Sequence, residues 1–429
     1  MDKINIAILG MGTVGQGVAI MLLKHKEFIG KQLGCEINLA RILEKFYDKE
    51  LDFDPGDIPI SDKWEDVVSD PDIHIVIEVI GGIEPAKTFI SEALRSGKHV
   101  VTANKDLLAV HGQELFAIAA EAGVDLYFEA SVGGAIPVLC ALRQNLLSDP
   151  VKEIMGIVNG TTNYILTRMA SEGGAFGDIL TDAQRLGFAE SNPAADVEGI
   201  DAGRKTAILS TLAFSSQVTL DDVYIEGITK ITKEDMSFAE SMGFAIKLVA
   251  ICKENDGKIE ARVHPTLLPL NHPLASVMDT FNAVFIRADH LGEVMLYGRG
   301  AGRYPTASAI LGDVSEIARN MRYGSGGRLT RISGRDKMII PIEDVMTRFF
   351  LRVILTDKPG VLAVVAKTLS EHNVSLNTIN QIDYVGGDAE LVFITHLVKE
   401  GDMRAALKQL KSLEVTKEII TVLRVEGVA

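Results

Sequence analysis

Cysteine is scarce in this 429-residue chain, which contains only Cys35, Cys140 and Cys252. Their number is odd, they lie far apart in the sequence, and no CxxC pair occurs among them. These facts exclude a disulfide framework and a cysteine-based metal site, and they fit a reducing compartment.

The sequence also lacks the features of secreted and membrane proteins. The opening MDKINIAILG has neither a basic region nor a cleavage site of small residues, so we expect no signal peptide. No uninterrupted apolar run reaches the length that spans a membrane. We therefore expect a cytoplasmic protein without a membrane partner.

Basic residues are outnumbered, with 43 Lys and Arg against 58 Asp and Glu, which gives a formal net charge of −15. Nucleic acids and anionic membranes both require a basic surface, so we expect neither as a partner. An anionic cofactor is still compatible, because it needs only a local positive patch. The length of 429 residues predicts two to four domains, and the 47% of hydrophobic residues suffices for a core in each.

A glycine-rich turn follows the first apolar segment. Lys3 to Leu9 is rich in β-branched residues, the sequence GMGTVGQG comes next, and a helical pattern runs from Val18 to Lys26. Glycines between a strand and a helix allow backbone N–H groups to approach a pyrophosphate. A tight turn without a ligand is the alternative. The candidate cofactor-binding residues are Gly10, Gly12, Thr13, Val14 and Gly15.

Glu44 ends the second predicted strand, Ile37 to Leu43. An acidic residue at this point accepts hydrogen bonds from the ribose hydroxyls and favours NAD over NADP. The connection from the glycines is longer than usual, and Arg41, Lys45 and Lys49 could bind a 2′-phosphate. The cofactor is therefore NADP or NAD.

Strands and helices alternate through the first third of the chain, which predicts a doubly wound parallel sheet. Ligands bind at the carboxyl ends of such strands, where Gly81, Thr102, Lys105 and Glu129 lie. For Lys105, a solvated loop lysine is the alternative. The loop from Phe128 to Pro137 either coordinates a hard cation through Glu129 and backbone carbonyls, or forms a hinge between domains.

Charged residues gather in GFAESNPAADVEGIDAGRK, residues 187–205. Asp201 and Lys205 are four residues apart, so a helix places both on one face. One interpretation is a solvated capping segment with an ordinary surface ion pair. The other is a pocket whose carboxylates hold a substrate ammonium and whose lysine transfers a proton.

The middle of the chain reads as a mixed α+β substrate domain, and its Thr161 and Thr162 either cap a helix or bind substrate. The glycine-rich segment from Tyr297 to Arg319 could return to the first domain. The tail from Arg348 has βαββαβ order, which predicts a ferredoxin-like unit. Its DKPGVL turn indicates either a small-ligand sensor or part of a dimerisation module.

With these motifs placed, nearly the whole chain resembles homoserine dehydrogenase with a C-terminal ACT domain. The resemblance rests on seven segments in the family's order, GMGTVGQGV, EVIGGIEPA, VVTANKDLLA, EASVGGAIP, NGTTNYIL, GFAESNPAADVEGIDAGRK and GAGRYPTASA. Aspartate-semialdehyde dehydrogenase fits less well, because it needs a nucleophilic cysteine paired with a histidine.

The resemblance implies reversible NAD(P)H-dependent reduction of L-aspartate 4-semialdehyde to L-homoserine, in the biosynthesis of threonine, methionine and isoleucine. Lys205 would then be the proton donor and acceptor, and Asp201 would orient it. Substrate would contact Glu190, Asp201, Gly160, Thr161 and, less centrally, Asp196. Lys105 would lie between nicotinamide and substrate, and the cofactor site would also include Glu44, Thr102 and Gly302. A sodium ion would bind Glu129, Val132, Gly134 and Ile136.

The expected domains are a Rossmann-type dinucleotide-binding domain at 1–135, to which 303–325 return, and a catalytic and dimerisation domain at 136–302. A linker at 326–347 and an ACT domain at 348–429 follow. The resemblance implies an amino-acid effector, most plausibly threonine, and a homodimer or homotetramer. The rival hypothesis is a non-enzymatic, NAD-responsive amino-acid sensor, which would not need a proton carrier.

Overall fold

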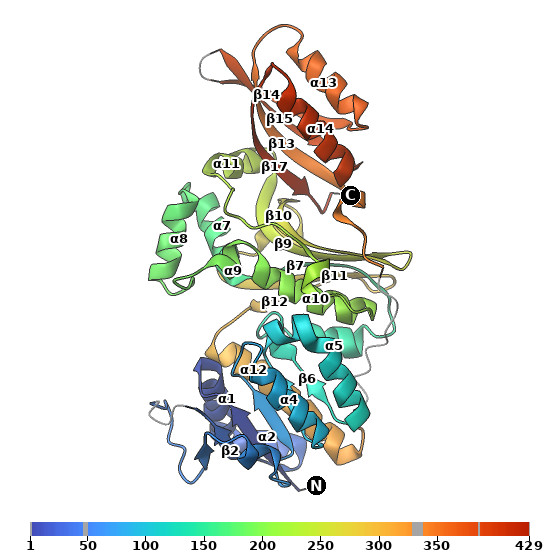
Figure 1. Cartoon of the computed structure of the whole chain (residues 1–429). Helices are drawn as coiled ribbons and strands as arrows, with labels where there is room; N and C mark the ends of the chain where they lie inside the picture. Colours follow the sequence, from blue (N-terminus) through green and yellow to red (C-terminus); the bar gives the residue numbers. More distant parts are fainter. Residues whose placement is uncertain (1, 46–49, 328–337, 385–386, 429) are drawn as a thin grey trace. The chain divides into compact units, whose positions relative to one another are not determined.

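The computed structural model describes residues 2–45, 50–327, 338–384 and 387–428 (Figure 1). The predictions for Lys49 and for residues 328–337 of the linker lie outside these residues. The chain forms two compact units. Unit 1 comprises residues 1–154, 204–223 and 281–337, and unit 2 comprises residues 155–203, 224–280 and 338–429.

A parallel sheet forms the centre of unit 1, with the order β3-β2-β1-β4-β5-β6. Its strands are β1 (Lys3–Leu9), β2 (Glu36–Leu43), β3 (Ile60–Ser61), β4 (Ile75–Glu78), β5 (His99–Thr102) and β6 (Leu126–Tyr127). Ile6, Ile8 and Ile77 are fully buried in it. Apolar, β-branched strands of this kind are typical of a parallel sheet covered on both faces. The predicted doubly wound sheet is confirmed.

The helices of unit 1 are α1 (Thr13–Lys24), α2 (Lys26–Leu33), α3 (Glu65–Val68), α4 (Ala86–Arg95), α5 (Lys105–Ala122) and α12 (Arg303–Tyr323). The helix expected from residue 18 to 26 is in fact split, because α1 starts at Thr13 and the chain bends at His25. Helix α12 returns to the sheet and buries Ile310 and Val314 in the same core as Val18.

Unit 1 also contains an irregular segment after β6, with turns of helix at Glu129–Ser131, Val138–Cys140 (α6) and Ala141–Asn145. An antiparallel hairpin of β11 (Phe281–Ala288) and β12 (Gly292–Arg299) precedes α12. Helix α10 (Ile200–Phe214) begins in unit 2 and continues in unit 1 from Arg204.

Unit 2 contains the long antiparallel strands β9 (Phe244–Asn255) and β10 (Lys258–Pro269), beside the end of β7 (Val151–Ile157). The short strand β8 (Tyr224–Ile225) pairs with β10 in parallel. The helices are α7 (Gly160–Glu172), α8 (Phe176–Arg185), α9 (Ala194–Val197) and α11 (Lys233–Ser241).

The C-terminal part of unit 2 has the order that the sequence predicts, with β13 (Met346–Thr356), α13 (Val361–Glu371), β14 (Leu376–Tyr384), β15 (Asp388–Thr395), α14 (Glu400–Ser412) and β17 (Thr416–Val425). Its strands lie in the order β17-β13-β15-β14, and both helices pack on one apolar core. Strand β17 also pairs with β10, where Arg424 lies opposite Thr266. The ferredoxin-like unit is therefore joined to the preceding sheet through β17.

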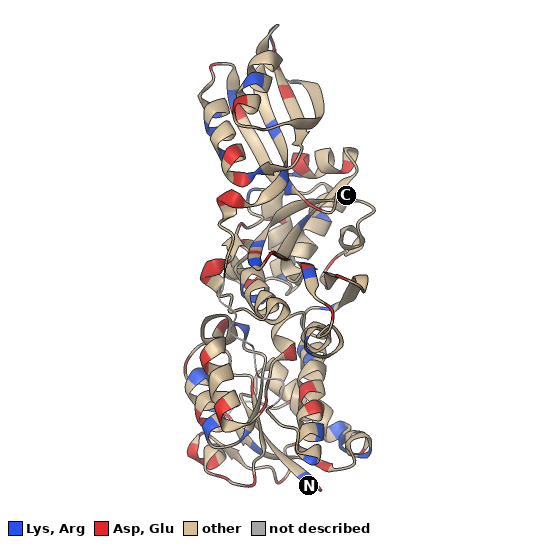
Figure 2. Cartoon of the chain, turned by 90° about the vertical axis from the view of Figure 1, so that its right-hand side faces the viewer, with Lys and Arg blue, Asp and Glu red and all other residues tan. Residues whose placement is uncertain are grey.

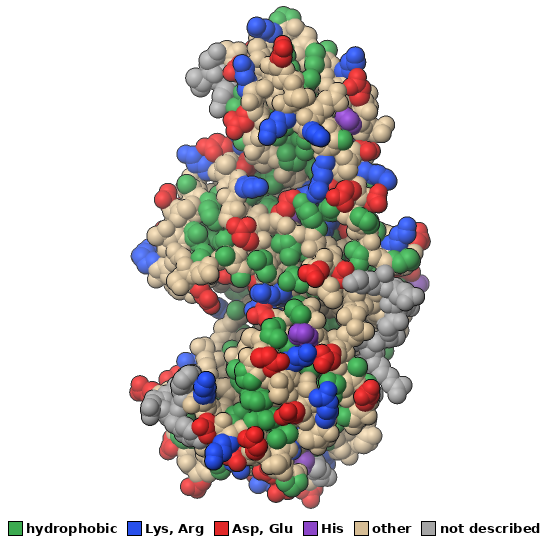
Figure 3. Space-filling model, viewed as in Figure 1, with side chains coloured by type: hydrophobic (Ala, Val, Ile, Leu, Met, Phe, Trp, Pro, Cys, Tyr) green, Lys and Arg blue, Asp and Glu red, His purple; other side chains and the backbone are tan. Residues whose placement is uncertain are grey.

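Acidic and basic residues are interspersed along the ribbon of both units (Figure 2). The face drawn in Figure 3 likewise shows lysine and arginine beside aspartate and glutamate, rather than a field of one sign. Of the helices that the structure describes, none combines the length and the apolar character needed to cross a membrane.

Candidate active site

The glycine turn after β1 has the geometry of a phosphate cradle. Gly10 has a φ of +95°, and a Cβ atom on Gly15 would lie 2.0 Å from the carbonyl oxygen of Gly10. Gly12 is the N-cap of α1, no side chain caps this helix, and a Cβ on Gly12 would have no atom within 4 Å. The uncapped backbone N–H groups of α1 therefore open onto space that an anion can fill. Thr13 is exposed there, and Val14 is half-buried.

Glu44 follows β2 and closes the other side of the glycine turn. Its Oε2 accepts a hydrogen bond of 2.7 Å from the backbone N–H of Met11. Its own N–H donates to the carbonyl oxygen of Ser61. Glu44 therefore lies at the glycine turn, while Lys45 beside it is exposed.

Gly302 lies in the third segment of unit 1, residues 281–337. It is the N-cap of α12 with a φ of +120°. One residue later, Arg303 packs so closely on α1 that a Cβ on Gly17 would lie 2.7 Å from its Cγ. The start of α12 is therefore held against α1.

Two buried residues that sequence reasoning missed shape the ends of β4 and β5. Glu78 accepts hydrogen bonds from Thr102 Oγ1 (2.5 Å) and from the N–H groups of Ile80 and Gly81. Asn104 caps α5 and donates to the carbonyl oxygen of Gly82. A single acid in the apolar run IHIVIEVI was the signal for Glu78.

Lys105 is the first residue of α5 and is half-buried. The Asn104 cap fixes the start of this helix, and the bond from Asn104 to Gly82 ties it to the loop after β4. A solvated loop lysine, the alternative reading, is not what the structure shows, since Lys105 belongs to a capped helix at the cofactor edge of the sheet.

Asn159 connects a helix start to two carboxylates in unit 2. Its Oδ1 accepts from the N–H of Thr162 and so caps α7. Its Nδ2 donates to Asp196 Oδ1 at 2.7 Å and to Asp201 Oδ2 at 2.8 Å. Asn159 is only 5% exposed. Sequence reasoning gave Asn159 no role, but its amide binds both predicted carboxylates.

The other predicted substrate residues lie near the start of α7 or in the loop before α9. Gly160 packs so tightly that a Cβ would lie 2.8 Å from the carbonyl oxygen of Thr280. Thr161 Oγ1 donates to the carbonyl oxygen of Phe188 at 2.7 Å. Glu190 is exposed, and its main-chain carbonyl accepts a hydrogen bond from Gln184.

Helix α10 carries both residues predicted to act on the reacting oxygen. Asp201 is 5% exposed and Lys205 is 9% exposed, and the four-residue spacing puts them one turn apart. A surface ion pair is therefore excluded, because both side chains are buried. The neighbouring Arg204 forms an ion pair of 3.1 Å with Asp106 at the start of α5.

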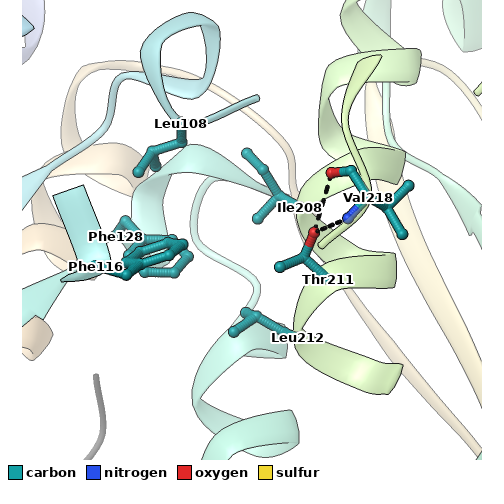
Figure 4. A pocket seen from close by; sticks show the side chains of 7 residues that line it. All are labelled: Leu108, Phe116, Phe128, Ile208, Thr211, Leu212 and Val218. Atoms are coloured by element: carbon teal, nitrogen blue, oxygen red, sulfur yellow. Dashed lines mark hydrogen bonds between the residues drawn. The ribbon is translucent and has the colours of Figure 1, made fainter. Parts of the chain in front are cut away.

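A small apolar pocket lies where the later part of α10 meets α5 (Figure 4). Its volume is about 20 Å³, and its only polar side chain, Thr211, exchanges hydrogen bonds with the backbone of Val218. The other lining residues are Leu108, Phe116, Phe128, Ile208 and Leu212. A space of this size is too small for a substrate. Its walls instead fix α10 beyond Lys205.

The loop proposed for a cation is buried, with Glu129 5%, Val132 0% and Ile136 1% exposed. The Glu129 carboxylate accepts from the N–H groups of Leu139 (2.8 Å) and Cys140 (2.6 Å), and it lies 3.6 Å from Arg143. Burial raises the pKa of Glu129, although the charge of Arg143 opposes this. Gly134 touches the β12–α12 connection, since its Cβ would lie 2.4 Å from Gly300 O.

Comparisons with known proteins agree with this geometry. Three family models match the chain: homoserine dehydrogenase over residues 137–315, homoserine dehydrogenase NAD-binding domain over 10–129, and ACT domain over 349–415. The homoserine dehydrogenase of Bacillus subtilis is 44% identical over 100% of this chain and 99% of its own length.

Solved structures give the same result. A homoserine dehydrogenase from Thiobacillus denitrificans has a TM-score of 0.93 and 38% identity, covering 99% of this chain and 98% of that one. A hyperthermophilic archaeal homoserine dehydrogenase in complex with NADPH has a TM-score of 0.61 and 30% identity, covering 73% of this chain and 97% of that one. The chain therefore belongs to the homoserine dehydrogenase family of NAD(P)-dependent oxidoreductases, and it ends in an ACT domain.

Proposed function

We propose that this chain reversibly reduces L-aspartate 4-semialdehyde to L-homoserine with Lys205 as the proton carrier. The observation that carries the proposal is the burial of Lys205 one helical turn after Asp201, which Asn159 holds beside Asp196. Burying a charged lysine costs free energy, and buried ionisable groups near a carboxylate pair are enriched at functional sites.

Each residue then has a defined task. Asp201 and Asp196 attract the substrate ammonium, and Asn159 fixes the distance between their carboxylates. Lys205 delivers a proton to the carbonyl oxygen during reduction and removes it from the hydroxyl during oxidation. When bound, the nicotinamide supplies the hydride chemistry. Glu190, Gly160, Thr161 and Lys105 complete the proposed substrate contacts.

The cofactor fits the glycine turn, because Gly12 leaves open space at the uncapped start of α1. Thr13, Val14, Gly15 and Thr102 belong to the same edge of the sheet. Glu44 favours ribose hydroxyls and hence NAD, whereas Arg41 and Lys45 offer charge for a 2′-phosphate. Measuring turnover with each cofactor at equal concentration decides between NAD and NADP.

The test of Lys205 is its replacement by alanine. We expect Lys205→Ala to lower kcat by about 10²–10⁴-fold, because general acid–base catalysis is lost. Binding of the reduced cofactor, followed by its fluorescence, is expected to be unchanged. Lys230→Ala, which removes an exposed lysine of unit 2, is the control. Near-normal turnover of Lys205→Ala would exclude the residue as proton carrier.

An absorbance assay of the reduced nicotinamide separates this function from the rival hypothesis of a non-enzymatic sensor. A sensor without catalysis gives no change in absorbance at the reduced nicotinamide band when homoserine and NAD(P)⁺ are mixed with the protein. An enzyme gives a change that requires both substrates.

We also propose a sodium ion at Glu129, Val132, Gly134 and Ile136. Oxygen ligands in one buried loop support it. Arg143 already balances the charge of Glu129, so backbone carbonyls would hold the ion chiefly. Replacing sodium by choline at constant ionic strength should lower the melting temperature and activity. An identical response to both salts argues against the site.

The ACT domain supports regulation by an amino acid, for which we propose threonine. The DKPG turn ends at Gly360, the N-cap of α13 with a φ of +93°, which presents an uncapped helix start. We further propose a cytoplasmic homodimer or homotetramer. Inhibition assays with threonine, isoleucine and methionine, and sedimentation of the purified protein, test these two statements.

A further inference from the structure

Strand β8 and the residues after it, 224–228, lie between the ACT domain and the substrate carboxylates within unit 2. We refer to residues 224–228 as the β8 segment. The two sides of this segment make different kinds of contact. One side of the segment bonds to arginines of the ACT domain, and the other side packs against the turn between α9 and α10.

The contacts with the ACT domain are charged and largely buried. Arg424 on β17 donates to Glu226 Oε2 at 2.7 Å and Oε1 at 3.1 Å. The same guanidinium binds Glu400 at 2.8 and 2.6 Å. Tyr224 OH accepts from Arg424 (3.2 Å) and Arg404 (3.1 Å). Two bidentate pairs on one arginine fix its position strongly.

The electrostatics of this cluster favour the charged forms. Burial alone would raise the pKa of Glu226, but the hydrogen bonds and charge of Arg424 outweigh it and lower the pKa. Burial and the bond to Glu226 raise the pKa of Tyr224 to about 12. Glu226 is therefore ionised, and Tyr224 keeps its proton, at neutral pH.

The contacts on the other side are between backbones. The N–H of Ile228 donates to the carbonyl oxygen of Val197 at 2.8 Å. A Cβ on Gly227 would lie 2.2 Å from that oxygen and 2.5 Å from the Cα of Glu198. A Cβ on Gly199 would lie 3.2 Å from Glu226 O. Backbones in such close contact move together.

Residues 197–199 stand directly between the two substrate carboxylates. Asp196 precedes them, Gly199 donates its N–H to Asp196 O at 2.9 Å, and Asp201 opens α10 two residues later. Asn159 holds both carboxylates from the other side. The backbone that joins the two carboxylates is therefore packed on the β8 segment, while Asn159 holds their side chains.

We propose that Glu226 and Arg424 are positioning residues for the substrate carboxylates, because their ion pair holds the β8 segment against residues 197–199. This inference rests on the proposed role of Asp196 and Asp201 in binding substrate. It gives the ACT domain a direct mechanical connection to substrate affinity: a change at β17 alters the site through Glu226.

The test is steady-state kinetics of the full-length enzyme with Glu226→Gln and Arg424→Met. We expect KM for homoserine to rise about 10-fold in each variant, with kcat within about 3-fold and KM for the cofactor unchanged. Glu226→Gln preserves shape, and its side chain is 37% exposed, so this variant is expected to fold. The double variant should have the same KM as Arg424→Met alone, because Arg424→Met already removes the bond to Glu226 and, in addition, the bonds to Glu400.

Arg352→Met is the matched control. Arg352 is another buried arginine of the ACT domain, but it binds Asp235 on α11 and Glu390 instead of the β8 segment. It should lower the melting temperature while leaving KM for homoserine within about 2-fold. An equal rise of KM in this control, or a wild-type KM in Glu226→Gln, overturns the inference.

Asp201→Asn separately tests the assumption that Asp201 binds substrate. If this variant has a normal KM for homoserine, the proposed substrate role of Asp201 fails.

Discussion

The side chain of Asn159 combines two functions that are usually separate. Its oxygen caps α7, and its nitrogen donates to Asp196 and Asp201. A helix cap is a structural feature, but here the capped end of α7 also carries the proposed substrate contacts Gly160 and Thr161. Replacing this residue should therefore alter stability and substrate affinity together.

We expect Asn159→Ala to lower the free energy of unfolding by about 1–2 kcal/mol, since a helix cap is lost. KM for homoserine should rise at least about 10-fold, because two carboxylates lose their shared donor. Thr232→Ala, which removes the cap of α11, is the control. It should cost similar stability in a denaturant titration and leave KM unchanged; a matching rise in KM would assign the effect of Asn159 to stability alone.

Lys247 on β9 shows a different use of a buried lysine. Its Nζ donates to Val277 O (2.6 Å) and Asn163 Oδ1 (3.2 Å), and it is 3% exposed. Burial lowers its pKa to about 8. An unfolded lysine titrates near ~10.4, so the unfolded chain binds more protons between these values, and stability must rise with pH there.

For Lys247 this amounts to a gain of about 2 kcal/mol in the free energy of unfolding between pH 7 and pH 9.5, relative to Lys247→Met. Urea titrations of both proteins at the two pH values measure the difference. Lys258→Met removes an exposed lysine and should show no such dependence. A parallel pH profile for wild type and Lys247→Met would contradict the lowered pKa.

At the scale of elements, two glycines of the turn after β1 allow the effect of a substitution on stability to be distinguished from its effect on cofactor binding. A Cβ at Gly15 clashes with the carbonyl of Gly10, while a Cβ at Gly12 meets open space. Gly15→Ala should therefore lower both the melting temperature and cofactor affinity. Gly12→Ala should keep the melting temperature within about 2 °C and still weaken NAD(P)H binding at least 10-fold, because the methyl group occupies the proposed phosphate position.

Gly177→Ala on α8 completes this comparison, because its Cβ also meets no atom within 4 Å and lies far from the turn in sequence. Melting curves and fluorescence titrations with NADPH distinguish the three variants. Unchanged cofactor affinity in Gly12→Ala would show that the open space at α1 is not where the phosphates bind.

The sequence predicted the elements that have strong local signals. The parallel sheet, the glycine turn and the βαββαβ tail follow from apolar runs and glycine positions, and all are confirmed. Glu44 was found because an acid at the end of β2 has a known function in such sheets. Motif resemblance, rather than spacing, supplied the roles of Lys205 and Asp201.

Residues that act through tertiary contacts escaped prediction. Asn159, Glu78 and Asn104 are polar residues whose functions depend on partners distant in sequence. Arg424 is similar, since its glutamate partners lie 24 and 198 residues away. No local pattern encodes such distances, so only the fold shows them.

At the scale of the whole molecule, the ACT domain extends the sheet of β9 and β10 in unit 2. Strand β17 pairs with β10 on one side and with β13 on the other, and its Arg424 binds Glu226. A regulatory domain attached only by a linker could be removed without consequence for its neighbour. Here its removal takes β17 away from one edge of β10, which still pairs with β9 and β8, and it leaves Glu226 without Arg424.

We therefore expect a chain that ends at Gly327 to keep part of its turnover, to have a raised KM for homoserine and to lose inhibition by amino acids. The hyperthermophilic archaeal homoserine dehydrogenase in complex with NADPH supports retained turnover, since it covers 73% of this chain and 97% of its own. The shortened chain should also have a lower melting temperature than the full-length chain, because the edge of β10 that pairs with β17 becomes exposed. Initial rates of both chains with threonine, isoleucine and methionine measure the response, and a full-length enzyme indifferent to all three would leave β17 as a structural strand rather than a regulatory one.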